Sequence, residues 1–309
     1  MNIRSILVVT DLSAHENIAV ERAWQLADTH RASITLMYVP PRGQNAAPTA
    51  ASRLAKAARQ LEESLNLRVR TAPVKSGTLK DLIAQARGMD LVVLPHRQER
   101  STAAFFRGQP VLRLLRGCNC PVLVVRQARG ERYERVLVAV DFSEASESLV
   151  KLAATFDTRA ELEIFHAIST LDESKLRSAE APEHAVRAYR EKCLRYARDR
   201  IVSLTDSFEA RRNRVLTAIG RGDPGRQTVI QQEYTGADLV VLGKKRSTAW
   251  EDFFCGSVAH RVLSWGSSDV LVVPDAYLRA TAPHAARRMA TSLGRNIALP
   301  LQAAARRMP

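Results

Sequence analysis

The sequence predicts an α/β protein made of two domains of one fold, each a five-stranded parallel sheet with helices on both faces. Two long stretches align without a gap: MDLVVLPHRQERSTAAFFRGQPVLRLLRGCNCPVLVV from Met89 and ADLVVLGKKRSTAWEDFFCGSVAHRVLSWGSSDVLVV from Ala237. Each is preceded by a similar opening strand, ILVVTDLS from Ile6 and VLVAVDFS from Val136. A duplicated domain explains both matches. Within each copy, apolar runs alternate with helical periodicity, which is typical of a parallel sheet with right-handed crossovers.

The first copy begins with a strand that ends at Thr10-Asp11, and Ser13-x-x-Glu16 has the spacing of a capping box for the helix that follows. We expect its strands at 3–9, 33–39, 67–74, 91–94 and 122–125, and its helices from Ser13 to 29 and at 51–64, 79–86 and 111–115.

The second copy repeats this order, with a longer helical region in its middle. Asp223-Pro224 forms a typical N-cap and N1 pair. We expect its strands at 136–140, 162–166, 214–219, 239–242 and 270–273, and its helices at 144–156, 172–207, 227–234 and after Gly256-Ser257. The predicted domains span 1–128 and 133–275, and a basic extension spans 276–309.

Composition narrows the class of protein. The chain has 309 residues and four cysteines, and the cysteine spacing fits neither a disulfide framework nor a zinc site, so we expect reduced thiols. The first apolar run is too short for a secretory signal, and no run approaches a membrane span. The sequence therefore predicts a cytoplasmic protein.

The formal net charge of +14 is unevenly distributed. Residues 1–130 carry 19 basic and 9 acidic side chains, and residues 131–275 carry 21 basic and 23 acidic ones. Residues 276–309 carry 6 basic side chains and no acidic one. Such basicity attracts anionic partners, but no nucleic-acid-binding motif accompanies it, so we do not expect nucleic acid as the primary partner. Gly294 and Pro300 interrupt the tail, which is either a short amphipathic helix or a loosely ordered extension. We expect it to contribute little to folding.

The loop between 243 and 257 has the size and residue types of a phosphate-binding loop. Glycines at 243 and 256 permit positive φ and close backbone approach, and the free N–H groups of the next helix can meet an anion. Beside Gly243, the run Lys244-Lys245-Arg246 is either a solvated charge cluster or a set of phosphate partners. Gly220-x-Gly222-x-x-Gly225 matches a dinucleotide fingerprint, but it follows the third strand of its domain, and we interpret it as a turn.

Two aspartates end the opening strands, where parallel sheets bind ligands. For Asp11 we favour a helix-capping role, whereas for Asp141 capping and ligand binding remain equally open. His166 lies on a strand and is expected to pack or to cap a strand end. No zinc-binding motif or nucleophile elbow is present, and no residue set supplies a nucleophile, a base and an oxyanion donor, so we do not expect an enzyme.

These features together resemble the universal stress protein family in its tandem form, over roughly residues 1–275. In nucleotide-binding members of that family, the loop after the fourth strand reads Gly, two residues, Gly, nine residues, Gly-Ser/Thr. Its glycines wrap the phosphates, and the Asp after the first strand lies beside them. The resemblance implies two Rossmann-like domains of the adenine nucleotide alpha hydrolase type.

The resemblance implies a nucleotide site in the second copy and a degenerate one in the first. It assigns cofactor binding to seven residues of the second copy, which are Asp141, Ala167, Leu242, Gly243, Arg246, Gly256 and Ser257. Among them, Ala167 would face the adenine, and Arg246 replaces the second glycine of the loop. The first copy keeps Asp11, Val39 and Gly108, but it has Pro95, Gln98 and Gln109 at the remaining loop positions.

The leading hypothesis is a stress-response protein whose second domain binds ATP, with Mg²⁺, as a regulatory ligand. The alternative is an interaction protein that binds no nucleotide and acts through paired sheets, and Arg246 distinguishes the two by filling the phosphate site or pointing at phosphate. In either case we expect the closing strands, 122–125 and 270–273, to lie together at a pseudo-two-fold interface, because their edges would otherwise stay open.

Overall fold

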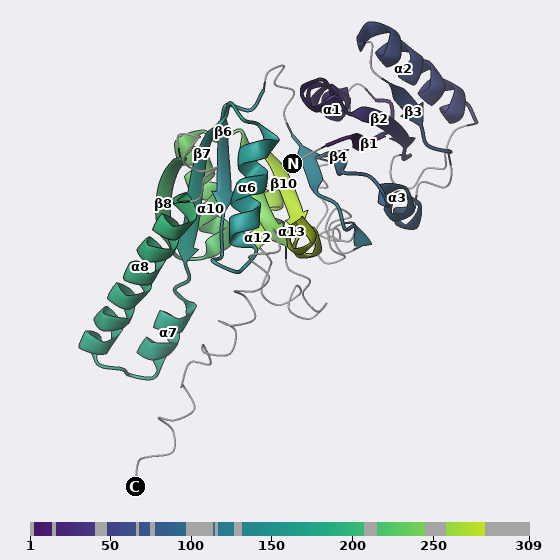
Figure 1. Cartoon of the computed structure of the whole chain (residues 1–309). Coiled ribbons are helices and arrows are strands. Elements are labelled where there is room, and N and C mark those ends of the chain that lie inside the picture. The colour runs from purple at the N-terminus through teal and green to yellow at the C-terminus, as the bar shows by residue number, and fades with distance from the viewer. Residues whose placement is uncertain are drawn as a thin grey trace.

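A computed structural model of the chain describes residues 3–13, 17–40, 48–65, 68–74, 78–96, 114, 117–126, 132–206, 215–244 and 258–281. Within them, ten strands form one continuous sheet in the order β3-β2-β1-β4-β5-β10-β9-β6-β7-β8. Each half contributes five parallel strands, as the sequence predicts. Figure 1 shows the two halves side by side along this sheet.

The first half follows the predicted alternation of strands and helices. Its elements are β1 (Ser5–Thr10), α1 (Asn17–His30), β2 (Ser33–Tyr38), α2 (Ala50–Leu65), β3 (Val69–Thr71), α3 (Leu79–Ala86), β4 (Leu91–Pro95) and β5 (Val122–Val125). Glu16 of the expected capping box and most of the helix expected at 111–115 lie outside the described residues.

The second half repeats that order with longer elements at its outer edge. They are β6 (Arg135–Ala139), α6 (Ser146–Phe156), β7 (Glu161–Ile168), α7 (Leu171–Ser178), α8 (Glu183–Thr205), β8 (Val215–Arg221), α10 (Pro224–Thr235), β9 (Leu239–Lys244), α12 (Val258–Trp265), β10 (Asp269–Pro274) and α13 (Asp275–Thr281). Asp223 caps α10 by accepting a 2.9 Å hydrogen bond from Arg226 N, and Gly222 has φ 139°, so the glycine-rich motif is a turn, as interpreted.

The helical region expected at 172–207 is helical in the structure and consists of two helices. The chain turns back between them at Glu180, which has φ 55°, and Pro182 precedes the first residue of α8. The expectation that the tail contributes little to folding fails for its first residues. They belong to α13, whose Leu278 is 1% exposed within the core. Residues 282–309 lie outside the described part.

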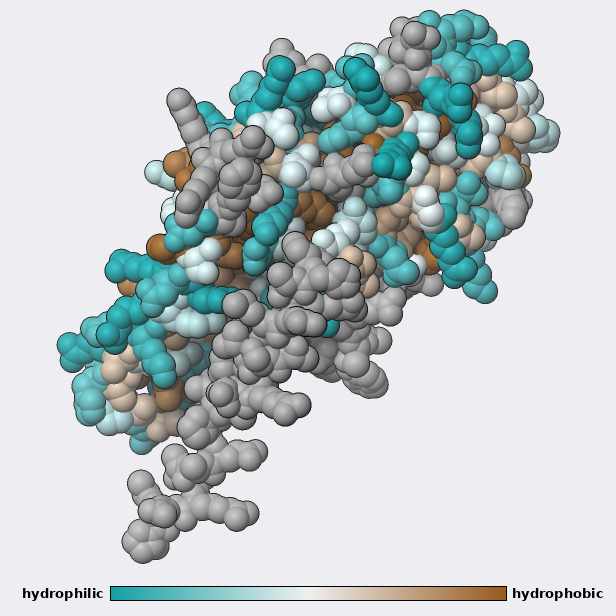
Figure 2. Space-filling view, viewed as in Figure 1, coloured by the Kyte–Doolittle hydropathy of each residue, from teal (hydrophilic) through white to brown (hydrophobic). Residues whose placement is uncertain are grey.

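Alternate strand residues face two hydrophobic layers. One layer packs the sheet against α1, α2, α6, α8 and α13, and the other packs it against α3, α10 and α12. Strand residues such as Val92, Leu123 and Val240 are completely buried, as expected for parallel strands covered on both faces. On the face shown in Figure 2, hydrophilic residues cover most of the surface, with hydrophobic ones in small patches between them.

The closing strands join the halves, as predicted. β5 and β10 pair antiparallel, with Leu123 opposite Leu271. Beside them lies a buried polar cluster in which Asp269 accepts hydrogen bonds of 2.8 Å from Arg126 N and from the Tyr133 hydroxyl. Arg22 of α1 forms an ion pair with Asp269 at 3.4 Å and stacks on the Tyr133 ring. Because Arg22 and Arg126 come from the first half and Tyr133 and Asp269 from the second, the two halves share a single packed interface.

Among the described residues, no helix is both long and apolar enough to span a bilayer.

Candidate functional site

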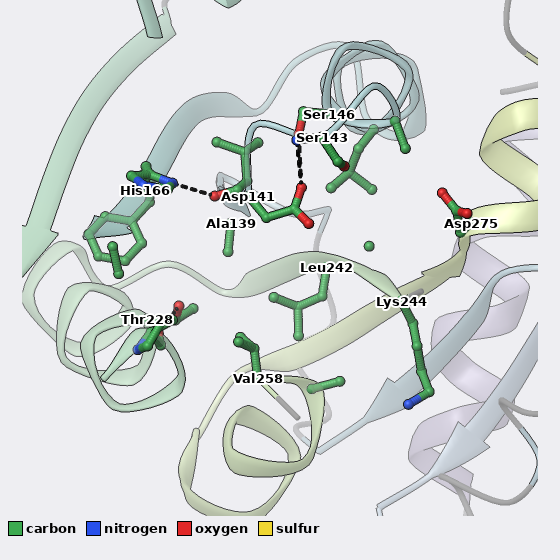
Figure 3. A pocket seen from close by; sticks show the side chains of 18 of the residues that line it. Ala139, Asp141, Ser143, Ser146, His166, Thr228, Leu242, Lys244, Val258 and Asp275 are labelled. Atoms are coloured by element: carbon green, nitrogen blue, oxygen red, sulfur yellow. Dashed lines mark hydrogen bonds between the residues drawn. The ribbon is translucent and has the colours of Figure 1, made fainter. Parts of the chain in front are cut away.

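The candidate site is a cavity of about 360 Å³ at the carboxyl ends of β6, β7 and β9. Open parallel sheets bind ligands at this edge, and the volume lies in the usual range for small-molecule pockets. The walls come from these strand ends, from α6, α10 and α12, and from α13 (Figure 3).

Four of the seven residues that the sequence assigned to a ligand line this cavity. They are Asp141, Ala167, Leu242 and Gly243, from three different strand ends. The other three, Arg246, Gly256 and Ser257, lie outside the described residues. The spatial grouping of the four agrees with the assigned site, and their contact with a ligand stays a prediction.

Asp141 is held in a defined position by its own loop. Its Oδ1 accepts hydrogen bonds from Ser143 N at 2.9 Å and from the Ser146 hydroxyl at 3.2 Å, while Phe142 has φ 57°. Since Ser146 begins α6, the carboxylate supports the helix start and also faces the cavity. Asp11 makes the equivalent bond to Ser13 N at 2.8 Å, which is the local turn expected of an aspartate at this position.

His166 lies at the cavity with a fixed tautomer. Its Nδ1 lies 2.8 Å from the Val140 carbonyl oxygen, which only accepts, so Nδ1 carries the proton and Nε2 is the acceptor. The ring stacks on Phe142 with centroids 3.9 Å apart. Burial lowers the pKa of His166 below 6.5, which favours the neutral ring near pH 7. The strand-end role was predicted, whereas its place in the cavity wall was not.

Gly243 and Lys244 form the described start of the predicted phosphate loop. Gly243 does not use the positive φ that a glycine permits, and a Cβ there would meet Leu149 and Leu278 at ordinary distances of 3.6 and 3.8 Å. Neither its φ nor its packing therefore requires a glycine at this position. Lys244 lines the cavity and is 9% exposed. Burial, then the Lys244 charge, lowers the pKa of His260 on α12.

Several cavity residues were missed by sequence reasoning. Ser143, Ser146 and Thr228 bring hydroxyl groups to the cavity, and Asp275 and Leu278 come from α13. Thr228 is one turn after the predicted N-cap of α10, which was the available signal for it. The α13 residues follow the last strand, where the sequence carries no repeat and no sustained periodicity.

The outer end of the second half is fixed by a separate charged cluster. Glu173 of α7 accepts hydrogen bonds from Arg190 of α8, at 2.9 Å from Nε, and from Arg221 at the end of β8. The Arg190 hydrogen bond, followed by Arg221, lowers the pKa of Glu173 to about 2. The cluster attaches the α7–α8 hairpin to the sheet edge, and the hairpin projects away from the body in Figure 1.

The site chemistry suits an anionic organic ligand. The Ser146 and Thr228 hydroxyls already donate to Asp141 and to the Pro224 carbonyl. Lys244 brings a positive charge to the lining that can attract phosphate, and small or apolar side chains such as Ala167, Leu242 and Val258 can cover a flat ring. The described residues contain no group of three or more side chains suited to a metal ion. Mg²⁺ commonly needs only one or two carboxylates with substrate phosphates, so Asp141 fits that smaller requirement.

The sequence profile of the Universal stress protein family matches residues 2–126 and again residues 132–274. The chain belongs to the universal stress protein family. The two matches follow the two halves of the sheet, so the family domain is present in tandem and the fold class predicted from the sequence is confirmed.

Solved structures agree with this tandem fold of universal stress protein domains. A functionally unknown protein from Pseudomonas aeruginosa PAO1 has 23% identity and a TM-score of 0.64, covering 94% of this chain and 98% of its own. A putative universal stress protein from Pseudomonas aeruginosa UCBPP-PA14 has 22% identity and a TM-score of 0.65 at the same coverage. One from Archaeoglobus fulgidus has 17% identity and a TM-score of 0.63, covering 89% and 99%. No relative was found among the curated proteins.

Proposed function

We propose that this chain is a cytoplasmic stress-response protein whose second domain binds an adenine nucleotide as a regulatory ligand. The observation that carries the proposal is the cavity at the carboxyl edge of the second half, which groups Asp141, Ala167, Leu242 and Gly243. Family membership supports the same edge as the ligand site. The proposed role is binding, because the described cavity lining combines a carboxylate, a lysine and apolar side chains that suit a nucleotide.

The proposed pose follows from the side chains on each wall. The adenine lies toward Ala167, where a small side chain leaves room beside the strand end. The phosphates lie toward Gly243 and Lys244, which begin the glycine loop. Mg²⁺, when bound, supplies positive charge between the phosphates and Asp141. Asp141 is suited to this because the Ser143 and Ser146 hydrogen bonds already fix its orientation.

The alternative function is contact with protein partners without a nucleotide. One observation favours it: α10 and α12 carry exposed Ile230, Tyr234 and Trp265, which are 46%, 86% and 58% exposed. Exposed aromatic residues of this kind are enriched at protein interfaces. The β5–β10 pairing does not favour self-association through those strands, because each already pairs inside the chain.

Isothermal titration of the full chain with Mg-ATP tests the proposed function. We expect saturable binding of one nucleotide per chain. Gly256→Val should abolish it, because a branched side chain obstructs the backbone approach to phosphate, while the matched variant Gly108→Val in the first half should leave it unchanged. No heat and no competition at millimolar nucleotide would overturn the proposal and leave the contact function.

A further inference from the structure

The cavity has a wall that does not belong to the family domain. The family match ends at residue 274, and α13 begins at Asp275. Asp275 and Leu278, both from this helix, line the cavity. Figure 3 shows Asp275 and Asp141 on the same side of Leu242, with Val258 and Thr228 on the other. A helix added after the domain therefore brings a second carboxylate to the proposed nucleotide site.

Packing fixes the position of this carboxylate. Leu278 is 1% exposed in the core layer that contains Leu149, and a Cβ on Gly243 would lie 3.8 Å from its Cδ1. The helix is thus held over the start of the predicted phosphate loop. Because Asp275 lies one turn before Leu278, it cannot leave the cavity edge without unpacking α13.

The negative charge of Asp275 is only partly neutralised by its neighbours, so it still acts on a ligand in the cavity. The Asp275 side chain is 15% exposed and pairs with Arg279 at 2.8 Å, but the Arg279 side chain is 71% exposed. An exposed arginine is screened by water and salt, so it offsets a partly buried carboxylate incompletely. Among the described residues that line the cavity, the two carboxylates of Asp141 and Asp275 are accompanied by one lysine, Lys244, whose side chain points away from both of them in Figure 3.

We propose that Asp275 is a specificity-determining residue that makes the cavity select nucleotides carrying a divalent cation over free nucleotides. The inference rests on the proposed nucleotide binding and deepens it. A bare triphosphate is repelled by two carboxylates, whereas a cation bound to the phosphates changes this repulsion to attraction. Mg²⁺ accepts one or two carboxylates together with phosphate oxygens, which matches the groups available here.

The test compares two titrations of the full-length protein, one with ATP and excess Mg²⁺ and one with ATP and EDTA. We expect the wild type to bind Mg-ATP at least about tenfold more tightly than free ATP. Asp275→Asn should strengthen binding of free ATP about fivefold, because one negative charge near the phosphates is removed. The ratio between the two affinities should fall accordingly.

Asp172→Asn is the matched control. Asp172 also lies in the first turn of a helix and forms an i,i+3 ion pair with Lys175, but it is exposed on α7 and does not line the cavity. The control removes the same charge from the chain and should keep the wild-type ratio. Asp275→Ser should repeat the result of Asp275→Asn, and circular dichroism should show both variants folded.

Each other outcome overturns the inference in a recognisable way. A wild-type ratio in both Asp275 variants overturns it alone and leaves nucleotide binding intact. Loss of all binding in folded Asp275 variants makes Asp275 an attractive contact and contradicts discrimination by repulsion. An equal fall of the ratio in Asp172→Asn assigns the effect to overall charge. Absence of binding in the wild type overturns this inference together with the proposed function.

Discussion

The carboxyl edges of the two halves share one backbone arrangement and differ in the size of their side chains. Strand registers coincide: Ile6 lies opposite Leu91 in the first half, and Val136 lies opposite Leu239 in the second. The loops after the opening strands also coincide, since Leu12 has φ 61° and Phe142 has φ 57°. The duplication has therefore kept the geometry of the edge.

At three corresponding positions the first half carries the larger residue, and these pairs are Val9 and Ala139, Val39 and Ala167, Pro95 and Gly243. Val9 is 5% exposed and Pro95 is buried, whereas Gly243 is exposed at the cavity. The space at the described strand ends thus depends on a few side chains. The comparison teaches that the size of the side chains at this edge can change in one copy without a change of fold.

The two halves also share a structural carboxylate. Asp90 accepts hydrogen bonds from Arg4 N at 2.9 Å and Ser5 N at 3.0 Å. Asp238, at the matching position, accepts from Glu134 N at 2.8 Å and from Arg135 N at 3.1 Å. Each aspartate therefore satisfies backbone donors at the start of the central strand of its half. The shared geometry of the central strand therefore extends to the amino edge of each half.

The largest expected effect is at the interface that joins the halves. Arg22→Ala removes one of the partners of Asp269, both side chains being nearly fully buried, and leaves the buried carboxylate with less compensating positive charge. We expect the free energy of unfolding to fall by about 3 kcal/mol. Urea unfolding followed by circular dichroism measures this, and a single transition would show that the halves unfold as one unit.

Arg135→Ala is the control for that change. It removes an exposed ion pair with Glu161, which has a separation of 3.9 Å, and an exposed hydrogen bond to the Thr235 carbonyl, and it should cost less than about 1 kcal/mol. Similar losses in the two variants would contradict the assigned importance of the buried pair. Two separate transitions in the wild type would contradict the single-unit interpretation.

The next prediction concerns α13, the helix that lines the cavity of the second half. Leu278→Ala removes a buried side chain and should lower the free energy of unfolding by about 2 to 3 kcal/mol. Truncation after Pro274 removes all of α13 and should lower the thermal midpoint at least as much as Leu278→Ala does. Truncation after Thr281 keeps α13 and should leave the thermal midpoint nearly unchanged. An unchanged midpoint after the shorter truncation would show that α13 does not contribute to stability.

Side-chain size at the ligand edge gives a smaller effect, on affinity. Ala167→Val places in the second half the residue that the first half has at Val39, and it should weaken Mg-ATP binding about tenfold, or 1.4 kcal/mol, by filling space beside the adenine. Val39→Ala is the matched change in the first half and should leave the titrated affinity unchanged. Equal affinities for Ala167→Val and wild type would remove Ala167 from the ligand wall.

The parts of the structure that sequence predicted are those with a strong local pattern. Apolar runs such as Leu239–Leu242 specify buried parallel strands, and the gap-free repeat specified both the second domain and the β5–β10 pairing. The family resemblance assigned Asp141 and Gly243 to the site. Their positions at the ends of parallel strands agree with that assignment, because open parallel sheets bind ligands at this edge.

What the sequence did not predict depends on contacts between distant segments. α13 has no repeat counterpart, and Leu278 is recognisable as a core residue only once α6 is in place beside it. The break between α7 and α8 combines a left-handed Glu180, which propensity does not favour, with a proline. The Arg22 and Asp269 pair joins residues far apart in sequence, and no pattern in either helix or strand indicates it.

The smallest expected effect is a pH dependence that compares one histidine from each half. Burial lowers the pKa of His30, whose Nε2 lies 3.1 Å from the Phe156 carbonyl oxygen across the interface, and burial likewise lowers the pKa of His166 in the cavity. A histidine with a lowered pKa binds fewer protons in the folded state than in the unfolded state. Stability is therefore constant above about pH 6.5 and falls as the pH drops through the lowered pKa.

We expect each histidine to account for less than about 1 kcal/mol of the loss between pH 7.5 and 5.5. Urea unfolding of wild type, His30→Gln and His166→Gln at both pH values isolates each contribution as the part of the pH dependence that the substitution removes. Glu163 acts in the opposite direction, since burial raises its pKa and favours the folded state on acidification, but it is common to all three proteins and cancels in the difference.

The same histidines should differ in their effect on ligand protection. Mg-ATP should protect the wild type more at pH 7.5 than at 5.5, because protonation changes the charge and the hydrogen-bonding groups of His166 in the cavity wall, while His30→Gln should leave that protection unchanged. Equal protection by Mg-ATP at both pH values would show that His166 does not take part in binding. Its role would then be the hydrogen bond to the Val140 carbonyl, as His30 bonds to the Phe156 carbonyl.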